Sequence, residues 1–247
     1  MSSFKERIKK LASEKSPLVL ANDYENYNAT LESKTLGNIK ALNRYICAIK
    51  FNFHLLLPLS QKQITKINKT AHDSGLQTIA DIKLNDIGNT NFVASQTLWD
   101  LGFDAVIVNP MMGPSSLENL VNLAHKNKKG IISLCHMSSP EARVTYELAV
   151  QIQSKKTNLY KLFLEWATKT KVDGIIVGAT YPQIVKFCKQ KTNGKINIYS
   201  PGIGTQGGDI QKTMQSGSDY LIVGRTILKS QNPKQTAKSL FELAGKN

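Results

Sequence analysis

The sequence lacks several features that would assign it quickly to a class. No apolar run approaches the ~20 residues that a membrane helix needs, so we expect no membrane association. The three cysteines, Cys47, Cys135 and Cys188, lie far apart and form no CxxC pair, which argues against a disulfide framework and a zinc site. The basic N-terminal segment has no apolar stretch typical of a secretion signal. We therefore expect a cytoplasmic protein.

Acidic residues are also scarce, because 18 Asp and Glu stand against 32 Lys and Arg, for a formal net charge of +14. A basic chain can bind nucleic acid, since its cations displace the counterions of phosphate. Here the cations are almost all lysine and are spread along the chain, without an RNP-like aromatic pattern or a basic helical run. We interpret the charge as a lysine-rich surface with no nucleic-acid partner, although it favours an anionic substrate.

Short runs of β-branched apolar residues recur along the whole chain. Most are continuous rather than alternating, as expected for parallel strands covered on both faces. Helix-period segments separate them, and most strand starts are 20–30 residues apart. The runs are 17–23, 45–53, 76–83, 104–110, 130–136, 172–178, 195–202 and 218–225. Eight such units predict an α/β fold, a single (β/α)₈ TIM barrel domain over residues 1–247, with an open doubly wound sheet as the alternative.

Two further segments need a place in this barrel. The apolar spacing near the N-terminus predicts a helix at about 3–14, packed on the barrel. The interval from His136 to Val172 has room for a helix at about 157–169 and an extra loop. Barrel enzymes use such loops as lids over the site, but an ordinary surface insertion remains the alternative.

The segment 80–90, ADIKLNDIGNT, is the most informative. On a strand, Asp81 and Lys83 are two residues apart and so point to the same face. A carboxylate and an ammonium in a barrel interior must be paired, and strand carboxyl ends are where barrel active sites form. Asp86 follows in the loop. Lys50 in the second strand and Asp23 after the first add charges to the same rim; a simple structural ion pair is the alternative.

The last two strands carry the second signal. Strand seven leads into a glycine-rich loop, 200–209, and strand eight ends in Gly224 and Arg225. Glycines let backbone N–H groups approach a ligand, and arginine can hold a phosphate with two parallel hydrogen bonds. These loops are the recurrent phosphate site of TIM barrels, so we predict one here.

The remaining candidates indicate no cofactor chemistry. The four histidines show no metal-ligand spacing, so we expect no metal site. No dinucleotide fingerprint follows the first strand, which argues against a nicotinamide cofactor. Cys135 and Cys188 are interpreted as small core residues.

Taken together, these motifs resemble the orotidine 5′-monophosphate decarboxylase family, in its short microbial single-function form. The resemblance covers the full chain. It rests on 81–87 (DIKLNDI) with Thr90, Lys50, 21–23 (AND), 136–140 (HMSSP), 200–209 (SPGIGTQGGD) and 223–225 (VGR). It implies cofactor-independent decarboxylation of orotidine 5′-monophosphate (OMP) to uridine 5′-monophosphate (UMP) in pyrimidine biosynthesis, by a homodimer.

The resemblance also implies roles for residues at the matching positions. Lys83 would donate a proton to C6, Asp81 would lie near the substrate carboxylate, and Lys50 would hold the carboxylates and reach the ribose. Asp86 would enter the partner's site across the dimer interface. The substrate-binding residues would be Asp23 and Thr90 at the ribose, Ser138 at the pyrimidine, Gln206, Gly224 and Arg225 at the phosphate, and Pro201 and Gly204 in the glycine-rich loop. The loops 138–156 and 202–209 would close as lids.

One position departs from the family pattern, because many microbial members have glycine where this chain has Asn52. The nearest alternative is hexulose-6-phosphate synthase, a metal-dependent relative that shares the DxKxxD element. In that branch we expect a glutamate near the end of strand two, whereas this sequence has Lys50, which would repel a cation. A barrel-shaped binder of nucleic acid or a metabolite is the alternative of a different class.

Overall fold

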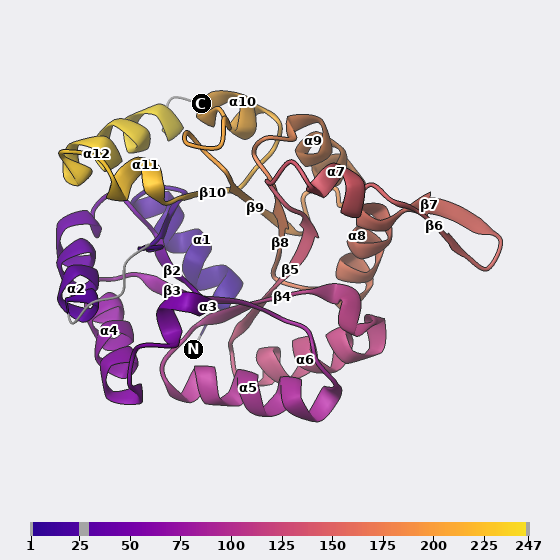
Figure 1. The fold of residues 1–247 in the computed structure, drawn as a ribbon, viewed down its shortest axis with the longest axis horizontal. Helices are drawn as coiled ribbons and strands as arrows, with labels where there is room; N and C mark the ends of the chain where they lie inside the picture. The colour runs from indigo at the N-terminus through magenta and orange to yellow at the C-terminus, as the bar shows by residue number, and fades with distance from the viewer. Residues whose placement is uncertain (1, 25–29, 246–247) are drawn as a thin grey trace.

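In the computed structural model, which describes residues 2–24 and 30–245, parallel strands close into a barrel. Within these ranges the strand order is β1-β10-β9-β8-β5-β4-β3-β2, so the barrel has eight strands (Figure 1). They are β1 Leu18–Ala21, β2 Ala48–Asn52, β3 Gln77–Leu84, β4 Ala105–Val108, β5 Gly130–His136, β8 Gly174–Val177, β9 Asn197–Pro201 and β10 Tyr220–Val223. The prediction of a TIM barrel is confirmed, with a strand in each of the eight apolar runs.

Helices surround the barrel and cover the outer face of its strands (Figure 1). Their apolar residues form one large core cluster with those strand residues that point outward. The helices are α1 Phe4–Glu14, α2 Leu31–Leu42, α3 Phe53–Leu56, α4 Gln61–Asp73, α5 Gly88–Asp100, η1 Pro110–Met112 (3₁₀), α6 Pro114–Lys126, α7 Ala142–Thr145, α8 Leu159–Thr170, α9 Pro182–Lys191, α10 Ile210–Gln215, α11 Arg225–Leu228 and α12 Pro233–Ala244. Burial on both faces explains why β4 reads as a continuous apolar run.

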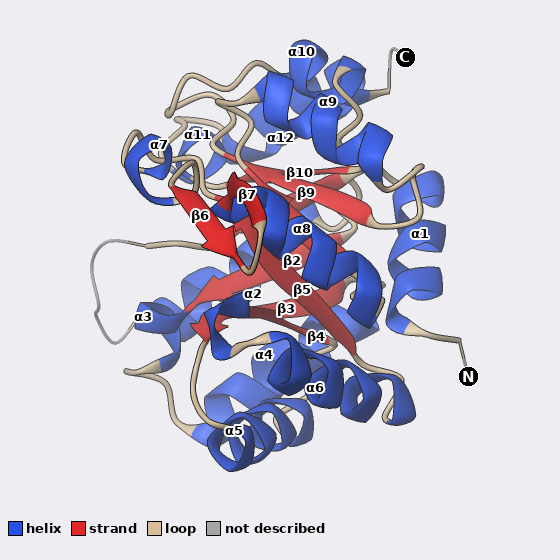
Figure 2. Cartoon of the chain, turned by 90° about the vertical axis from the view of Figure 1, so that its right-hand side faces the viewer, coloured by secondary structure: helices blue, strands red, loops and turns tan. Residues whose placement is uncertain are grey.

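Helix α1 closes the amino-terminal end of the barrel (Figure 2). Phe4 and Ile8 are fully buried and join the core cluster inside the barrel. A Cβ at Gly130, the first residue of β5, would lie 2.2 Å from the Phe4 ring, so the fit requires glycine there. Arg7 of the same helix pairs with Asp104 at 3.1 Å. This end of the barrel is therefore sealed, and a ligand must enter at the carboxyl end.

The long interval after β5 contains an element that the sequence analysis did not predict. Strands β6 Ala149–Ile152 and β7 Lys155–Asn158 pair as an antiparallel hairpin that projects away from the barrel (Figures 1 and 2). Its turn carries Gln153 at a φ of +55°, a conformation usually supplied by glycine or asparagine. Because those turn residues are absent, the sequence indicated only a loop.

Among the described residues, no helix combines the length and the apolar character that crossing a membrane requires.

Candidate active site

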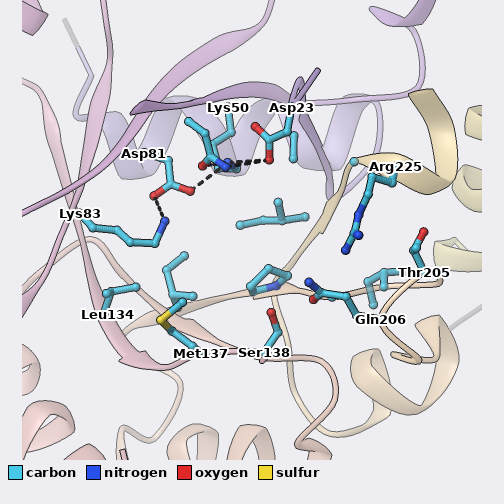
Figure 3. Close-up of a pocket in the computed structure, with 18 of the residues that line it drawn as sticks. Asp23, Lys50, Asp81, Lys83, Leu134, Met137, Ser138, Thr205, Gln206 and Arg225 are labelled. Carbon is cyan, nitrogen blue, oxygen red and sulfur yellow. Dashed lines mark hydrogen bonds and ion pairs between the residues drawn. The ribbon is translucent and has the colours of Figure 1, made fainter. Parts of the chain in front are cut away.

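A cavity of about 400 Å³ opens at the carboxyl ends of the barrel strands (Figure 3). Its size is within the usual range for sites that hold a small molecule. Nine of the predicted site residues line it: Asp23, Lys50, Asp81, Lys83, Ser138, Pro201, Gln206, Gly224 and Arg225. The structure thus brings together predicted residues from six strands and the loops that follow them.

Four charged side chains form a chain of ion pairs along one wall. Asp81 lies between two lysines, with Oδ1 2.9 Å from Lys83 Nζ and Oδ2 2.8 Å from Lys50 Nζ. Lys50 Nζ also lies 3.4 Å from Oδ2 of Asp23. Charges therefore alternate in sign along the wall, and each has an opposite neighbour.

The pairing keeps the buried members of this chain ionised. Burial alone would raise the pKa of Asp81, but the Lys50 and Lys83 ammonium groups outweigh it and hold that pKa below its ordinary value. Burial likewise disfavours the charged form of Lys50, yet Asp81 and Asp23 raise its pKa. The array is thus a set of fixed charges whose positions need no rearrangement when charge develops nearby.

The backbone of β3 bends at Lys83. Lys83 has a φ of +47°, and the pairing of β3 with β4 shifts register between Asp81 and Leu84. Strand alternation predicted that Asp81 and Lys83 share a face, and both do line the cavity. The register shift at Lys83 was not predicted, because it depends on the pairing of β3 with β4. Strained backbone of this kind is typical of functional sites.

Two residues that sequence reasoning did not select also line the cavity. Asn52 Oδ1 accepts a hydrogen bond from Lys50 Nζ at 2.6 Å, and its Nδ2 donates to Asp23 Oδ2 at 3.0 Å. His54 follows on α3. The available signal was spacing, since Asn52 is two residues from Lys50 and so shares its strand face.

Figure 3 shows Arg225 and Gln206 across the cavity from Lys83 and Asp81. Gln206 belongs to the glycine-rich loop, and Arg225 begins α11. Gly204 does not line the cavity within the described chain; it has a φ of +73°, and a Cβ there would lie 2.4 Å from Thr226 Oγ1. Gly204 therefore shapes the loop rather than contributing a side of the cavity.

Ser138 and apolar side chains line the wall between these two ends. Leu134, Met137 and Ile176 supply the apolar surface. The main chain at Ser138 is fixed from the loop after β8, because Thr180 Oγ1 donates to the Ser138 carbonyl at 2.9 Å. This wall is mainly apolar and carries one hydroxyl, that of Ser138 (Figure 3).

Asp86 and Thr90 lie outside this cavity. Both are exposed, in the segment 85–90 after β3. Asn91 braces the segment, since its amide donates to the Asp86 carbonyl at 2.6 Å and accepts from the Asp86 N–H at 3.1 Å. Large apolar side chains are exposed on this and the adjoining segments: Phe53, Leu57, Ile87, Phe92, Val93 and Met111. We call these six residues the apolar rim.

Comparison with known proteins agrees with this geometry. A profile of the orotidine 5′-phosphate decarboxylase / HUMPS family matches residues 16–240. The orotidine 5′-phosphate decarboxylases of Thermococcus kodakarensis and Pyrococcus abyssi are 33% and 31% identical, over 93% and 85% of this chain and 97% and 93% of theirs. A crystal structure of orotidine 5′-monophosphate decarboxylase from Methanocaldococcus jannaschii, complexed with inhibitor BMP, has a TM-score of 0.78 and 30% identity, covering 93% of this chain and 98% of that one. This chain belongs to the orotidine 5′-phosphate decarboxylase / HUMPS family.

Proposed function

We propose that this protein decarboxylates OMP to UMP and carbon dioxide in pyrimidine biosynthesis, without a metal or an organic cofactor. The observation that carries the proposal is the position of Lys83, an ammonium held 2.9 Å from the Asp81 carboxylate at the mouth of the barrel. Such a group can stabilise negative charge on a carbon atom and then protonate it.

The chemistry requires this kind of stabilisation. When the C6–carboxylate bond of OMP breaks, carbon dioxide leaves and the bonding electrons stay on C6. No neighbouring atom takes up this charge, so the ammonium of Lys83 stabilises the carbanion and then transfers a proton to C6. The resulting amine recovers its proton from solvent. Asp81, next to the substrate carboxylate, keeps Lys83 in place until transfer.

The far end of the cavity would hold the phosphate. Arg225 and Gln206 lie across the cavity from Lys83 and Asp81 (Figure 3), and Gly224, which precedes Arg225, also lines the cavity. Ser138 would contact the pyrimidine, and Pro201 would bound the same pocket. The phosphate is remote from C6, so its binding energy can serve to hold the substrate and order the loops around it.

Asp23 would bind the ribose. Its Oδ1 atom is buried and has no hydrogen-bond partner among residues 2–24 and 30–245. Asp23 lines the cavity, and a carboxylate accepts hydrogen bonds from hydroxyl groups, so a ribose hydroxyl is a suitable ligand for it. Thr90 and Asp86 would complete the ribose site from across a dimer interface.

The proposed homodimer draws its support from the apolar rim. Its six large side chains are exposed at α3, at η1 and on the segment 87–93 that follows Asp86, with Ile87 at 73%. A group of exposed apolar side chains of this size is typical of an interaction surface. A two-fold axis through it would bring Asp86 of each protomer towards the partner's site. The three cysteines are free and buried, which fits the reducing cytoplasm that we propose as its location.

The first experiment follows the ultraviolet absorbance of OMP incubated with the protein and excess EDTA. We expect rapid loss of the orotate chromophore. No loss with EDTA, but aldol activity with magnesium on a hexulose phosphate, would overturn the proposal in favour of the synthase branch. The position of Lys50 argues against that branch, because a buried ammonium occupies the space between Asp23 and Asp81 where a cation would bind.

A further inference from the structure

Asn52 joins two members of the charged chain through its side-chain amide. Lys50 can only donate, so the amide oxygen must face it; the Asp23 carboxylate can only accept, so the amide nitrogen must face Asp23. The distances of 2.6 Å and 3.0 Å fit these roles. The chemistry of the two neighbours therefore determines the orientation of the Asn52 amide.

The hydrogen bonds of Lys50 show what Asn52 adds. The ammonium has three N–H groups, and Lys50 as a whole is only 3% exposed. Its acceptors are Asp81 at 2.8 Å, Asn52 at 2.6 Å and Asp23 at 3.4 Å. All three donors thus have an acceptor, and the contact with Asp23 is the longest. Asn52 consequently makes the shorter link between Asp23 and the rest of the chain of charges.

The two oxygens of the Asp23 carboxylate differ in their hydrogen-bond partners. Oδ2 accepts from Asn52 and from Lys50, whereas Oδ1 is buried without a partner in the described chain. An Asp23 side chain held only by the 3.4 Å contact could rotate and exchange its oxygens. The amide of Asn52 prevents this by fixing Oδ2, so the Asp23 carboxylate keeps one orientation at the cavity wall.

We propose that Asn52 is a positioning residue for ribose recognition: it holds the Asp23 carboxylate in the orientation that accepts a ribose hydroxyl, and it leaves the Lys50 ammonium free to pair with Asp81. This inference rests on the proposed function. It also gives a role to the residue at which this chain departs from the glycine of many microbial relatives, since glycine has no side chain to make either contact.

The test compares the affinities of UMP and 2′,3′-dideoxyuridine 5′-monophosphate, which lacks both ribose hydroxyls, by titration calorimetry. We expect Asn52→Ala to lower the affinity for UMP about tenfold, which is the scale of one hydrogen bond to a charged group. The affinity for the dideoxy nucleotide should change less than about twofold. Asp23→Ala should show the same selectivity. The double variant should bind UMP no more weakly than Asp23→Ala, because Asn52 acts through Asp23.

Two more variants separate orientation from packing. Asn52→Asp keeps the shape of the side chain but replaces the amide donor with a carboxylate that faces the Asp23 carboxylate. It should therefore lower the affinity for UMP at least as much as Asn52→Ala does. Asn127→Ala, at an exposed asparagine following α6, is the matched control and should change neither affinity. Equal losses for both nucleotides, or additive losses in the double variant, would overturn the role of Asn52 while wild-type turnover of OMP stands. A wild-type chain that neither turns over OMP nor binds UMP would overturn the proposed function itself.

Discussion

The Lys83 ammonium lies 2.9 Å from the Asp81 carboxylate, on a bulge where the backbone of Lys83 is left-handed. A residue kept in this conformation at a strand end has a placement that the fold maintains against local preference. The placement is explained if Lys83 is the proton donor.

We therefore predict that Lys83→Ala lowers kcat by at least about 10³-fold, because both carbanion stabilisation and protonation are lost. Binding of UMP should stay within a few-fold of wild type, since no carbanion is present in the product. Absorbance assays and calorimetry measure the two effects. Lys126→Ala, at an exposed lysine on α6, is the control. Turnover close to normal would remove Lys83 from this role.

Arg225 allows a second prediction, at the opposite end of the cavity. Arg225→Ala should lower kcat/KM for OMP about 10- to 100-fold, because two charge-assisted hydrogen bonds to the phosphate are lost. For orotidine, which has no phosphate, kcat/KM should fall much less. Arg44→Ala, at an exposed arginine, should leave kcat/KM for both substrates unchanged. Equal losses on OMP and orotidine would contradict the phosphate assignment.

How far the sequence predicted this structure depends on how local each feature is. The eight strands follow from apolar runs, and Asp23, Lys50, Asp81 and Lys83 follow from charges at the ends of those runs, which are local signals. Ser138, Pro201 and Gln206 were expected only from the family resemblance. The bulge at Lys83 depends on pairing between β3 and β4, and the contacts of Asn52 depend on β1 and β2 lying side by side. The β6–β7 hairpin lacked the turn residues that would have revealed it. Features that arise from contacts between distant segments thus escaped prediction.

Gly178 provides a prediction about the pyrimidine wall. A Cβ at this position would lie 2.5 Å from Ser138 Cα and 2.8 Å from the Met137 carbonyl oxygen, so the backbone itself must move. Gly178→Ala should destabilise the protein by about 1–3 kcal/mol and reduce activity by displacing Ser138. The matched control is Gly37→Ala in α2, where the Cβ would meet no atom of the described residues within 4 Å apart from its chain neighbours and the helix's own backbone. That variant should be neutral or slightly stabilising in thermal unfolding, because alanine favours helix. A Gly178 variant as stable and active as wild type would contradict the argument.

His125 makes stability depend on pH. Its Nε2 lies 3.2 Å from Asp173 Oδ2, and this hydrogen bond raises the pKa of His125 above 6.5, although partial burial opposes the shift. A raised folded-state pKa stabilises the protein fully below about pH 6.5, and the stabilisation is lost as pH rises through the folded value. His125→Asn should therefore lower Tm at pH 5.5 more than at pH 8.5. Because the side chain is partly exposed, we expect at most about 1 kcal/mol. An identical Tm difference at both pH values would show that the pair does not titrate in this range.

The exposed position of Asp86 leads to a test that separates the two protomers. If Asp86 acts in the partner's site, Lys83→Ala and Asp86→Ala chains should each be inactive alone but active when mixed. In a mixed dimer, one site combines both defects, while the other has an intact Lys83 and receives an intact Asp86. Random reassociation of equal amounts makes half the dimers mixed, so about a quarter of wild-type activity should return. Ile87→Glu, which places a charge in the apolar rim, should abolish both the dimer and this recovery, with sedimentation as the measure of assembly. If mixing restores no activity while mixed dimers are shown to form, Asp86 does not act across the interface.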